Sequence, residues 1–208
     1  MPDKLRVLTI LKKEYPRAKV ALEFGNPLQI LVATILSAQC TDKRVNMVTR
    51  DLFKKYKKAK DFARANQKTF ENEIRSTGFY KNKARNIINS AKKIATDFKG
   101  KVPQTMGELL TLPGVARKTA NIVLYNGYGI IDGIAVDTHV RRLAQKLGLS
   151  NSDDPVKIEQ DLMRVIPKKE WGRISYLLIE HGRKICDAKK PKCKQCALKK
   201  LCPSYKEK

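Results

Sequence analysis

The stretch LLTLPGVARKTANIVLYNGYGI, residues 109–130, places a lysine directly behind a Pro-Gly turn and at the head of an apolar helix. Lys118 is next to Arg117 and close to the positive end of the helix dipole. Both neighbours disfavour the ammonium relative to the neutral amine, and a neutral amine is a nucleophile. The position therefore indicates a lysine suited to covalent catalysis. The alternative is an ordinary surface lysine, one among many in this chain.

A carboxylate follows nineteen residues later. The sequence GIAVDTHVRRLAQKLGL, residues 133–149, runs from an apolar segment through Asp137 into an amphipathic helix. Aspartate is a favoured N-cap, and capping alone would explain Asp137. The apolar segment would also bring the carboxylate from a packed region to the rim of a cleft, where it could stabilise a cationic transition state or accept a proton. Lys118 and Asp137 are thus the candidate catalytic residues.

Four of the five cysteines form a C-x6-C-x2-C-x5-C pattern near the end of the chain, at Cys186, Cys193, Cys196 and Cys202. The N-terminal sequence lacks the apolar core of a secretory signal, so we expect an intracellular protein, in which two disulfides are disfavoured. Four thiolates then indicate a metal centre. The spacing leaves structural zinc and a [4Fe-4S] cluster open, since both accept four cysteines. We expect the remaining thiol, Cys40, to be an ordinary buried one.

The charge of the chain indicates a polyanionic partner. Forty-four Lys and Arg against twenty Asp and Glu give a net charge of +24, an excess that repels itself unless a polyanion shares the surface. Basic residues recur along the whole chain, which favours a basic face for nucleic acid on a folded body over a disordered arm. General solvation of a soluble, thermophilic protein is the alternative. Between the cysteines, a rigid loop would present Lys189, Lys190, Lys192 and Lys194 to phosphates.

Helices must position these groups. Apolar residues recur at helical spacing in segment after segment, Pro and Gly fall between the segments, and no strict alternation indicates a strand. The sequence predicts an all-α fold of about ten short helices. The run LQILVATILSA, residues 28–38, is too short to span a membrane and predicts a buried central helix. Trp171 and His181, on a later apolar helix, are expected to be packing residues.

The turn before Lys118 predicts a helix-hairpin-helix over about residues 105–126. One helix should end near Leu112 and the next begin near Arg117. Exposed N–H groups at such a turn grip a DNA phosphate without reading sequence, and non-enzymatic modules use the same motif. If Ala116, which stands where the usual pattern has glycine, must be left-handed, alanine costs about 1–2 kcal/mol. The candidate DNA contacts of the hairpin are Pro113, Gly114, Val115, Ala116 and Arg117.

Taken together, LPGVARKTA, GIAVDTH, LLIEHGRKIC and the cysteine-rich tail resemble the endonuclease III family, the iron-sulfur branch of the helix-hairpin-helix DNA glycosylases. ILSAQCTD (35–42) and STGFYKNKA (76–84) match the same family, so the likeness covers nearly the whole chain. The resemblance implies a two-lobed all-α fold with DNA bound across the cleft between the lobes. It also implies that the cysteines hold a [4Fe-4S] cluster and not zinc. The lobes implied are a six-helix middle lobe at 21–133, and 1–20 with 134–208 around a cluster loop at 186–202.

The resemblance also implies a reaction, because Lys118 and Asp137 fall on the family's catalytic lysine and aspartate. The enzyme would flip a damaged pyrimidine out of the duplex. Lys118 would attack C1′, displace the base and form a Schiff base, and β-elimination would then cut the strand 3′ to the abasic sugar, with Asp137 stabilising positive charge on the sugar. Gln39 and Phe79 match positions whose side chains fill the gap left by the base. A helix-end polar residue and loop-to-core packing are the respective alternatives for these two residues.

Two rival functions stay open at this point. A uracil or thymine mismatch glycosylase of the same superfamily is one, because sequence does not show the shape of a pocket. A non-catalytic iron-sulfur DNA-binding protein that uses the hairpin only as a clamp is the other. We expect a bifunctional DNA N-glycosylase/AP lyase of base excision repair that removes oxidised pyrimidines from double-stranded DNA. It should be a cytoplasmic, nucleoid-associated monomer without a membrane segment.

Overall fold

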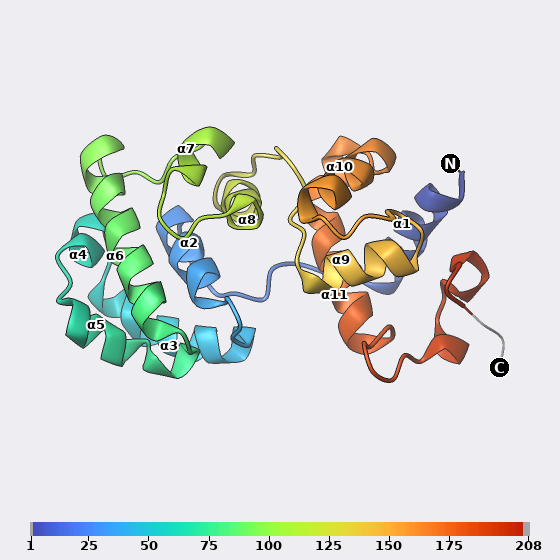
Figure 1. Ribbon diagram of the computed structural model, residues 1–208, viewed down its shortest axis with the longest axis horizontal. Helices are drawn as coiled ribbons and strands as arrows, with labels where there is room; N and C mark the ends of the chain where they lie inside the picture. The colour runs from blue at the N-terminus through green and yellow to red at the C-terminus, as the bar shows by residue number, and fades with distance from the viewer. Residues whose placement is uncertain (1, 206–208) are drawn as a thin grey trace. The chain divides into compact units, whose positions relative to one another are not determined.

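The computed structural model describes residues 2–205, and every regular element in that range is a helix, as predicted (Figure 1). None of the described helices is long and apolar enough to cross a membrane. In order, the elements are α1 (Pro2–Glu14), α2 (Pro27–Leu36), α3 (Asp42–Lys55), α4 (Ala59–Ala63), α5 (Gln67–Glu73), η1 (Arg75–Thr77), α6 (Tyr80–Asp97), α7 (Met106–Leu110), α8 (Arg117–Tyr128), α9 (Thr138–Lys146), α10 (Pro155–Val165), η2 (Lys168–Glu170), α11 (Trp171–Lys184), η3 (Cys193–Gln195) and η4 (Lys199–Leu201).

The described chain divides into two compact units. Ala21–Asp132 forms what we call the middle unit. The described residues up to Val20 and from Gly133 onward form the terminal unit.

The middle unit is built around α2, whose residues from Ile30 to Leu36 are all buried. This helix packs mainly against α8, while α6 packs mainly against α4 and α5. The prediction of a buried central helix from the run 28–38 is confirmed. Cys40, expected to be buried with it, is only partly buried, because it lies in the turn that follows the helix.

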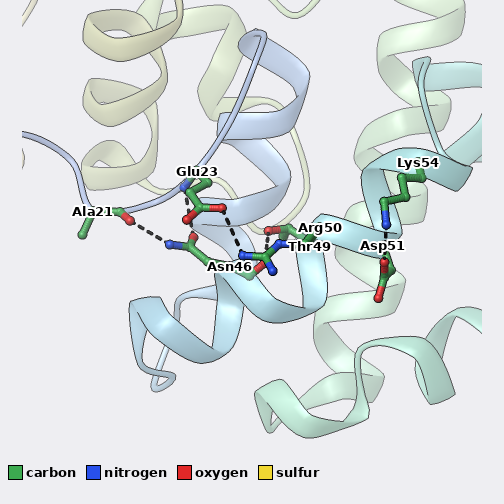
Figure 2. A network of polar contacts seen from close by, with 7 residues as sticks. All are labelled: Ala21, Glu23, Asn46, Thr49, Arg50, Asp51 and Lys54. Atoms are coloured by element: carbon green, nitrogen blue, oxygen red, sulfur yellow. Dashed lines mark hydrogen bonds and ion pairs between the residues drawn. The ribbon is translucent and has the colours of Figure 1, made fainter.

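The segment that enters the middle unit is fixed by one side chain of α3 (Figure 2). The Asn46 amide donates to the carbonyl oxygen of Ala21 at 2.9 Å and accepts from the N–H of Glu23 at 3.0 Å. An exposed ion pair between Arg50 and Glu23, at 4.0 Å, adds little to stability. The amide thus satisfies backbone groups that have no helix partner and sets the path of the chain into α2.

Within its described residues, the terminal unit joins the first α-helix of the chain to the last three, α9, α10 and α11. Helix α1 packs against α11, and α9 packs against both α10 and α11. Their shared core is mostly aliphatic. It includes Val7, Leu8, Leu11, Val140, Leu143, Ile158, Leu162, Ile174, Leu177 and Leu178.

The hairpin of the middle unit consists of α7, a six-residue turn and α8. Helix α7 ends at Leu110, two residues before the expected position, and α8 begins at Arg117 as expected. Gly114 is the left-handed residue of the turn, with φ +77°. Ala116 has φ −94° and ψ 169°, an extended conformation that any residue adopts, so the strain considered for this alanine does not arise.

Gly114 is constrained by its left-handed conformation and by close packing, whereas Gly129 is constrained by its left-handed conformation alone. A Cβ at Gly129 (φ +70°) would meet nothing within 4 Å, whereas a Cβ at Gly114 would lie 2.7–2.9 Å from side-chain atoms of Asn86. We expect Gly129→Ala to lower the free energy of unfolding by about 1–2 kcal/mol, the left-handed penalty alone. Gly114→Ala should cost about 1–3 kcal/mol more, because the methyl group overpacks the contact with α6. Urea denaturation of both variants measures the difference, and equal losses would contradict the close packing.

Candidate active site and nucleic-acid interface

Lys118 is the second residue of α8, partly buried, at the end of the helix that meets the hairpin turn. The N-cap of this helix is Ala116, which has no side-chain acceptor for the N–H groups of the first turn. The buried face of this helix, which includes Ala120, Val123 and Leu124, packs into the middle unit. Its positive end therefore presents backbone donors without a capping side chain, an arrangement suited to an anion.

The hairpin turn rests on α6. The hydroxyl of Ser90 donates to the carbonyl oxygen of Pro113 at 2.6 Å, and the Asn86 side chain lies directly against Gly114. Gly114 and Ala116 are exposed. Val115, predicted as a DNA contact, is placed differently: its side chain is buried, and its N–H donates to the carbonyl oxygen of Leu112 at 3.1 Å. Val115 therefore anchors the turn and does not offer a free donor.

Asp137 is the N-cap of α9, as the sequence predicts. Its Oδ1 accepts from the N–H of Val140 at 2.8 Å, and the residue is partly buried. The segment before it is held from two sides. The N–H of Ile134 donates to Glu159 of α10 at 3.1 Å, and the Ser175 hydroxyl of α11 donates to the carbonyl oxygen of Ala135 at 2.7 Å. The carboxylate is thus fixed in position by its own cap and by a well-packed support.

Gln39 and Phe79 share an unusual combination of properties. Both are exposed, and 62% of the surface of Phe79 is accessible to solvent. Both are also left-handed, with φ 53° and 49°, and Lys99 is the only other described non-glycine residue of that kind. Such a conformation costs roughly 1–2 kcal/mol, and strain of this sort concentrates at functional sites. Loop-to-core packing does not account for Phe79, since its ring is not buried.

The four cysteines near the end of the chain are partly buried, and the first of them, Cys186, follows the end of α11 by two residues. Burial raises the pKa of the Cys196 thiol, and negative charge on Cys186, Cys202 and Cys193 raises it further. Burial likewise raises the pKa of Cys186. The Arg142 guanidinium, which donates toward the sulfur at 3.9 Å, lowers that pKa in part. The four thiolates would repel one another unless a cation stood among them.

This set of ligands fits an iron-sulfur cluster. Among the described residues, no group of three or more His, Cys, Asp or Glu side chains lies close enough together to bind a single metal ion. A four-iron cluster takes one thiolate at each iron, so its cysteines do not have to converge on a single point. A donor set of four thiols without a carboxylate is also the one that such clusters use.

His181 has a role that its sequence pattern did not reveal. It was expected to be a packing residue, and it is indeed 3% exposed. Its Nδ1 lies 2.9 Å from the Tyr15 hydroxyl and its Nε2 lies 3.6 Å from the sulfur of Cys196. Burial, with the nearby Arg142 charge, lowers the pKa of His181 to about 4. A neutral imidazole thus links Tyr15, the residue after α1, to the segment 186–202 that carries the four cysteines (the cysteine loop), and it orients the thiol of Cys196.

The lysines between the cysteines are displayed as expected. Lys189, Lys190 and Lys192 are exposed. The turn that carries the first two is closed by Asp187, which accepts from the N–H groups of Lys189 at 2.8 Å and Lys190 at 3.0 Å. These two bonds hold the pKa of Asp187 below its usual value. A local turn of this kind gives the ammonium groups a defined outward direction.

Comparison with known proteins places the chain in a well-populated group. Residues 32–168 match the model for the HhH-GPD superfamily base excision DNA repair protein. Endonuclease III of Synechocystis sp. is 54% identical, over 95% of this chain and 90% of the relative; that of Bacillus subtilis is 44% identical, over 90% and 86%. A solved structure of a trapped endonuclease III-DNA covalent intermediate is 41% identical, with a TM-score of 0.92, and covers 97% of this chain and 96% of that chain.

Asp137 offers a way to separate capping from charge. Asparagine caps a helix about as well as aspartate does, so Asp137→Asn should change the free energy of unfolding by less than about 0.5 kcal/mol. Asp137→Ala should lower it by about 0.5–2 kcal/mol, because the N–H of Val140 loses its acceptor. Thermal denaturation of both variants checks the order. If asparagine were as destabilising as alanine, the carboxylate charge itself would be needed for the fold.

Proposed function

Because the chain belongs to the endonuclease III family, within the HhH-GPD superfamily of base excision DNA repair proteins, we propose that Lys118 and Asp137 perform its chemistry on DNA. The protein is a base excision repair DNA glycosylase/AP lyase that binds duplex DNA. Its proposed substrates are oxidised pyrimidines and abasic sites in the genome, which places it at the nucleoid inside the cell. The position of Lys118, partly buried at the uncapped head of α8, carries this assignment.

In the proposed mechanism, the backbone donors at the head of α8 hold a phosphate, with Gly114 and Ala116 exposed beside it. Lys118 is then directed at the neighbouring sugar. Its amine attacks C1′, the glycosidic bond breaks, and the base leaves with the bonding electrons and takes up a proton. The amine loses its proton as the sugar ring opens to a Schiff base. Removal of a C2′ proton then expels the 3′ phosphate by β-elimination and cuts the strand.

Asp137 would act on charge. A carboxylate near C1′ stabilises the positive charge that develops on the sugar as the base departs, and it can accept the proton that the attacking amine releases. Because the cap to Val140 holds Oδ1, the carboxylate does not have to reorganise during the reaction. The trapped covalent complex of a 41% identical protein supports a covalent route of this kind.

Extrusion of the base is assigned to Gln39 and Phe79. Unstacking a nucleotide costs a few kcal/mol, and side chains inserted into the vacated space offset it. Exposed, left-handed Gln39 and Phe79 suit that role, because neither is held in the core of the protein. Lys189, Lys190 and Lys192 would add phosphate contacts from the cysteine loop.

The four cysteines Cys186, Cys193, Cys196 and Cys202 would hold a [4Fe-4S] cluster, which supplies a rigid support for the loop between them. No step of the proposed reaction passes through it. His181 and Arg142 would orient the thiolates of Cys196 and Cys186.

The central test is covalent trapping. Wild type and Lys118→Gln are incubated with borohydride on duplexes that carry thymine glycol or an abasic site, with strand cleavage followed in parallel. The wild type should give an adduct on both duplexes and Lys118→Gln on neither, because the attacking amine is gone. Lys92→Gln, which removes the same charge from an exposed position on α6, should trap normally. Trapping only on abasic DNA would point to another damaged base, and uracil and mismatched thymine would be tested next. No adduct on either duplex would favour a non-catalytic DNA-binding protein that uses the hairpin only as a clamp.

The metal content tests the cluster. We expect about four iron and four sulfide per chain, without zinc, in the purified protein. Cys196→Ser should lose most of the iron and the visible absorbance, whereas Cys40→Ser should keep both, because Cys40 belongs to the middle unit and the four proposed ligands belong to the terminal unit. Stoichiometric zinc in place of iron would refute the assignment.

A further inference from the structure

A buried lysine lies beside the two turns that carry Gln39 and Phe79. Lys83, in the first turns of α6, is 4% exposed. Its Nζ donates to the carbonyl oxygen of Leu36 at 2.7 Å and to that of Thr77 at 2.8 Å. Among the described residues no carboxylate pairs with it, and burial lowers its pKa. A buried ammonium without a carboxylate partner lowers the free energy of unfolding. Its presence indicates that its hydrogen bonds have a function that an apolar side chain could not perform.

The two acceptors identify what the ammonium joins. Leu36 is the last residue of α2, three residues before Gln39, and Thr77 is the last residue of η1, two residues before Phe79. Carbonyl groups at helix ends have no partner within the helix. A single nitrogen satisfies both, so the two carbonyl oxygens can be no farther apart than the sum of the two bond distances. The backbone N–H of Lys83 also donates to the carbonyl oxygen of Phe79 at 3.1 Å.

The turns that Lys83 joins are also the strained ones. Gln39 and Phe79 adopt left-handed conformations, which persist only where the surroundings over-determine them. The ammonium of Lys83 binds the chain three residues before Gln39 and two residues before Phe79, and its backbone N–H binds the carbonyl oxygen of Phe79. A residue with three donors and a long, flexible stem can reach both turns at once, whereas a hydroxyl or an amide on a shorter stem would serve one.

From this geometry we propose that Lys83 is a positioning residue for base extrusion: its buried ammonium locks the turns of Gln39 and Phe79 in one mutual arrangement, so that both side chains enter the duplex together. The proposal rests on the proposed function, in which these two residues fill the gap left by the base. Lys83 touches no DNA itself and acts only through the turns.

The test compares extrusion with the chemistry that follows it. Lys83→Met removes the donors but keeps an unbranched side chain only one atom shorter. Lys83→Gln is equally neutral but keeps an N–H donor, and Lys92→Met is the exposed control on the same helix. Base release from a thymine glycol duplex is measured in single turnover, with 2-aminopurine opposite the lesion as a reporter of extrusion. Schiff-base formation is measured separately on a preformed abasic site, where no base has to be unstacked.

We expect Lys83→Met to slow base release and the fluorescence step by roughly tenfold to a hundredfold, as small displacements of positioning groups do. Schiff-base formation on the abasic duplex should slow by less than about threefold, since the nucleophile is intact. Lys83→Gln should recover part of the lost rate, and Lys92→Met should match wild type. Equal slowing of both reactions by Lys83→Met would overturn the proposal, because it would indicate general damage to the site.

A double-mutant comparison shows whether Lys83 acts through the two turns. In a Gln39→Ala/Phe79→Ala background, Lys83→Met should change base release by less than about twofold, because coupled residues are not additive. A full additional loss there would overturn the proposal. Failure of both neutral variants to fold would also overturn it, since the ammonium would then serve the fold itself.

The outcome also separates this proposal from the function on which it rests. If Gln39→Ala/Phe79→Ala releases the base at the wild-type rate, the assignment of these residues to extrusion fails, and the role of Lys83 fails with it. If that variant is slow and Lys83→Met is not, only the role of Lys83 is refuted. Loss of trapping in Lys118→Gln is independent of both results.

Discussion

The middle unit depends on one constraint, that backbone carbonyl groups at turns must find donors when they are buried. A single face of α6 meets this need. Lys83, Asn86 and Ser90 are spaced three and four residues apart and therefore share that face. The first satisfies the turns before Gln39 and Phe79, the second lies against Gly114, and the third satisfies Pro113. One helix thus fixes the hairpin turn and the turns of Gln39 and Phe79 relative to one another.

The terminal unit solves a similar problem for one carboxylate. Asp137 follows an extended segment that cannot satisfy its own backbone groups, and α10 and α11 provide Glu159 and Ser175 for the purpose. Both supporting helices belong to the core that also includes α1 and α9. The position of Asp137 therefore follows from the packing of the whole unit, and the cap to Val140 only completes it. A catalytic group is more accurately placed by packed helices than by a free loop.

The helical pattern and the hairpin could be predicted from sequence because they depend on local spacing. A shared centre for the four cysteines could be inferred because they are close together in the sequence. The contacts that support the site could not. Lys83 stands in the basic run YKNKARNIINSAKK, where it reads as one more surface charge. Its spacing of four from Ile87 was a signal that it shares a buried face, but the partners, six and 47 residues away, are backbone atoms that no sequence pattern marks. His181 was missed for the same reason, since Tyr15 lies 166 residues away.

The strain at Gln39 and Phe79 is consistent with the same account. Glycine would adopt a left-handed turn without penalty, so a side chain at both positions implies that the side chain itself is needed. Two such residues cost roughly 2–4 kcal/mol together. Hydrogen bonds to a charged donor contribute about 1.5–3 kcal/mol each, and Lys83 makes two of them to these turns. Burial of the ammonium opposes these bonds, so the comparison shows only that the bonds and the strain are of similar size. In the role that we propose, Lys83 holds both turns in the strained form before DNA arrives, so that ordering them does not have to accompany extrusion of the base.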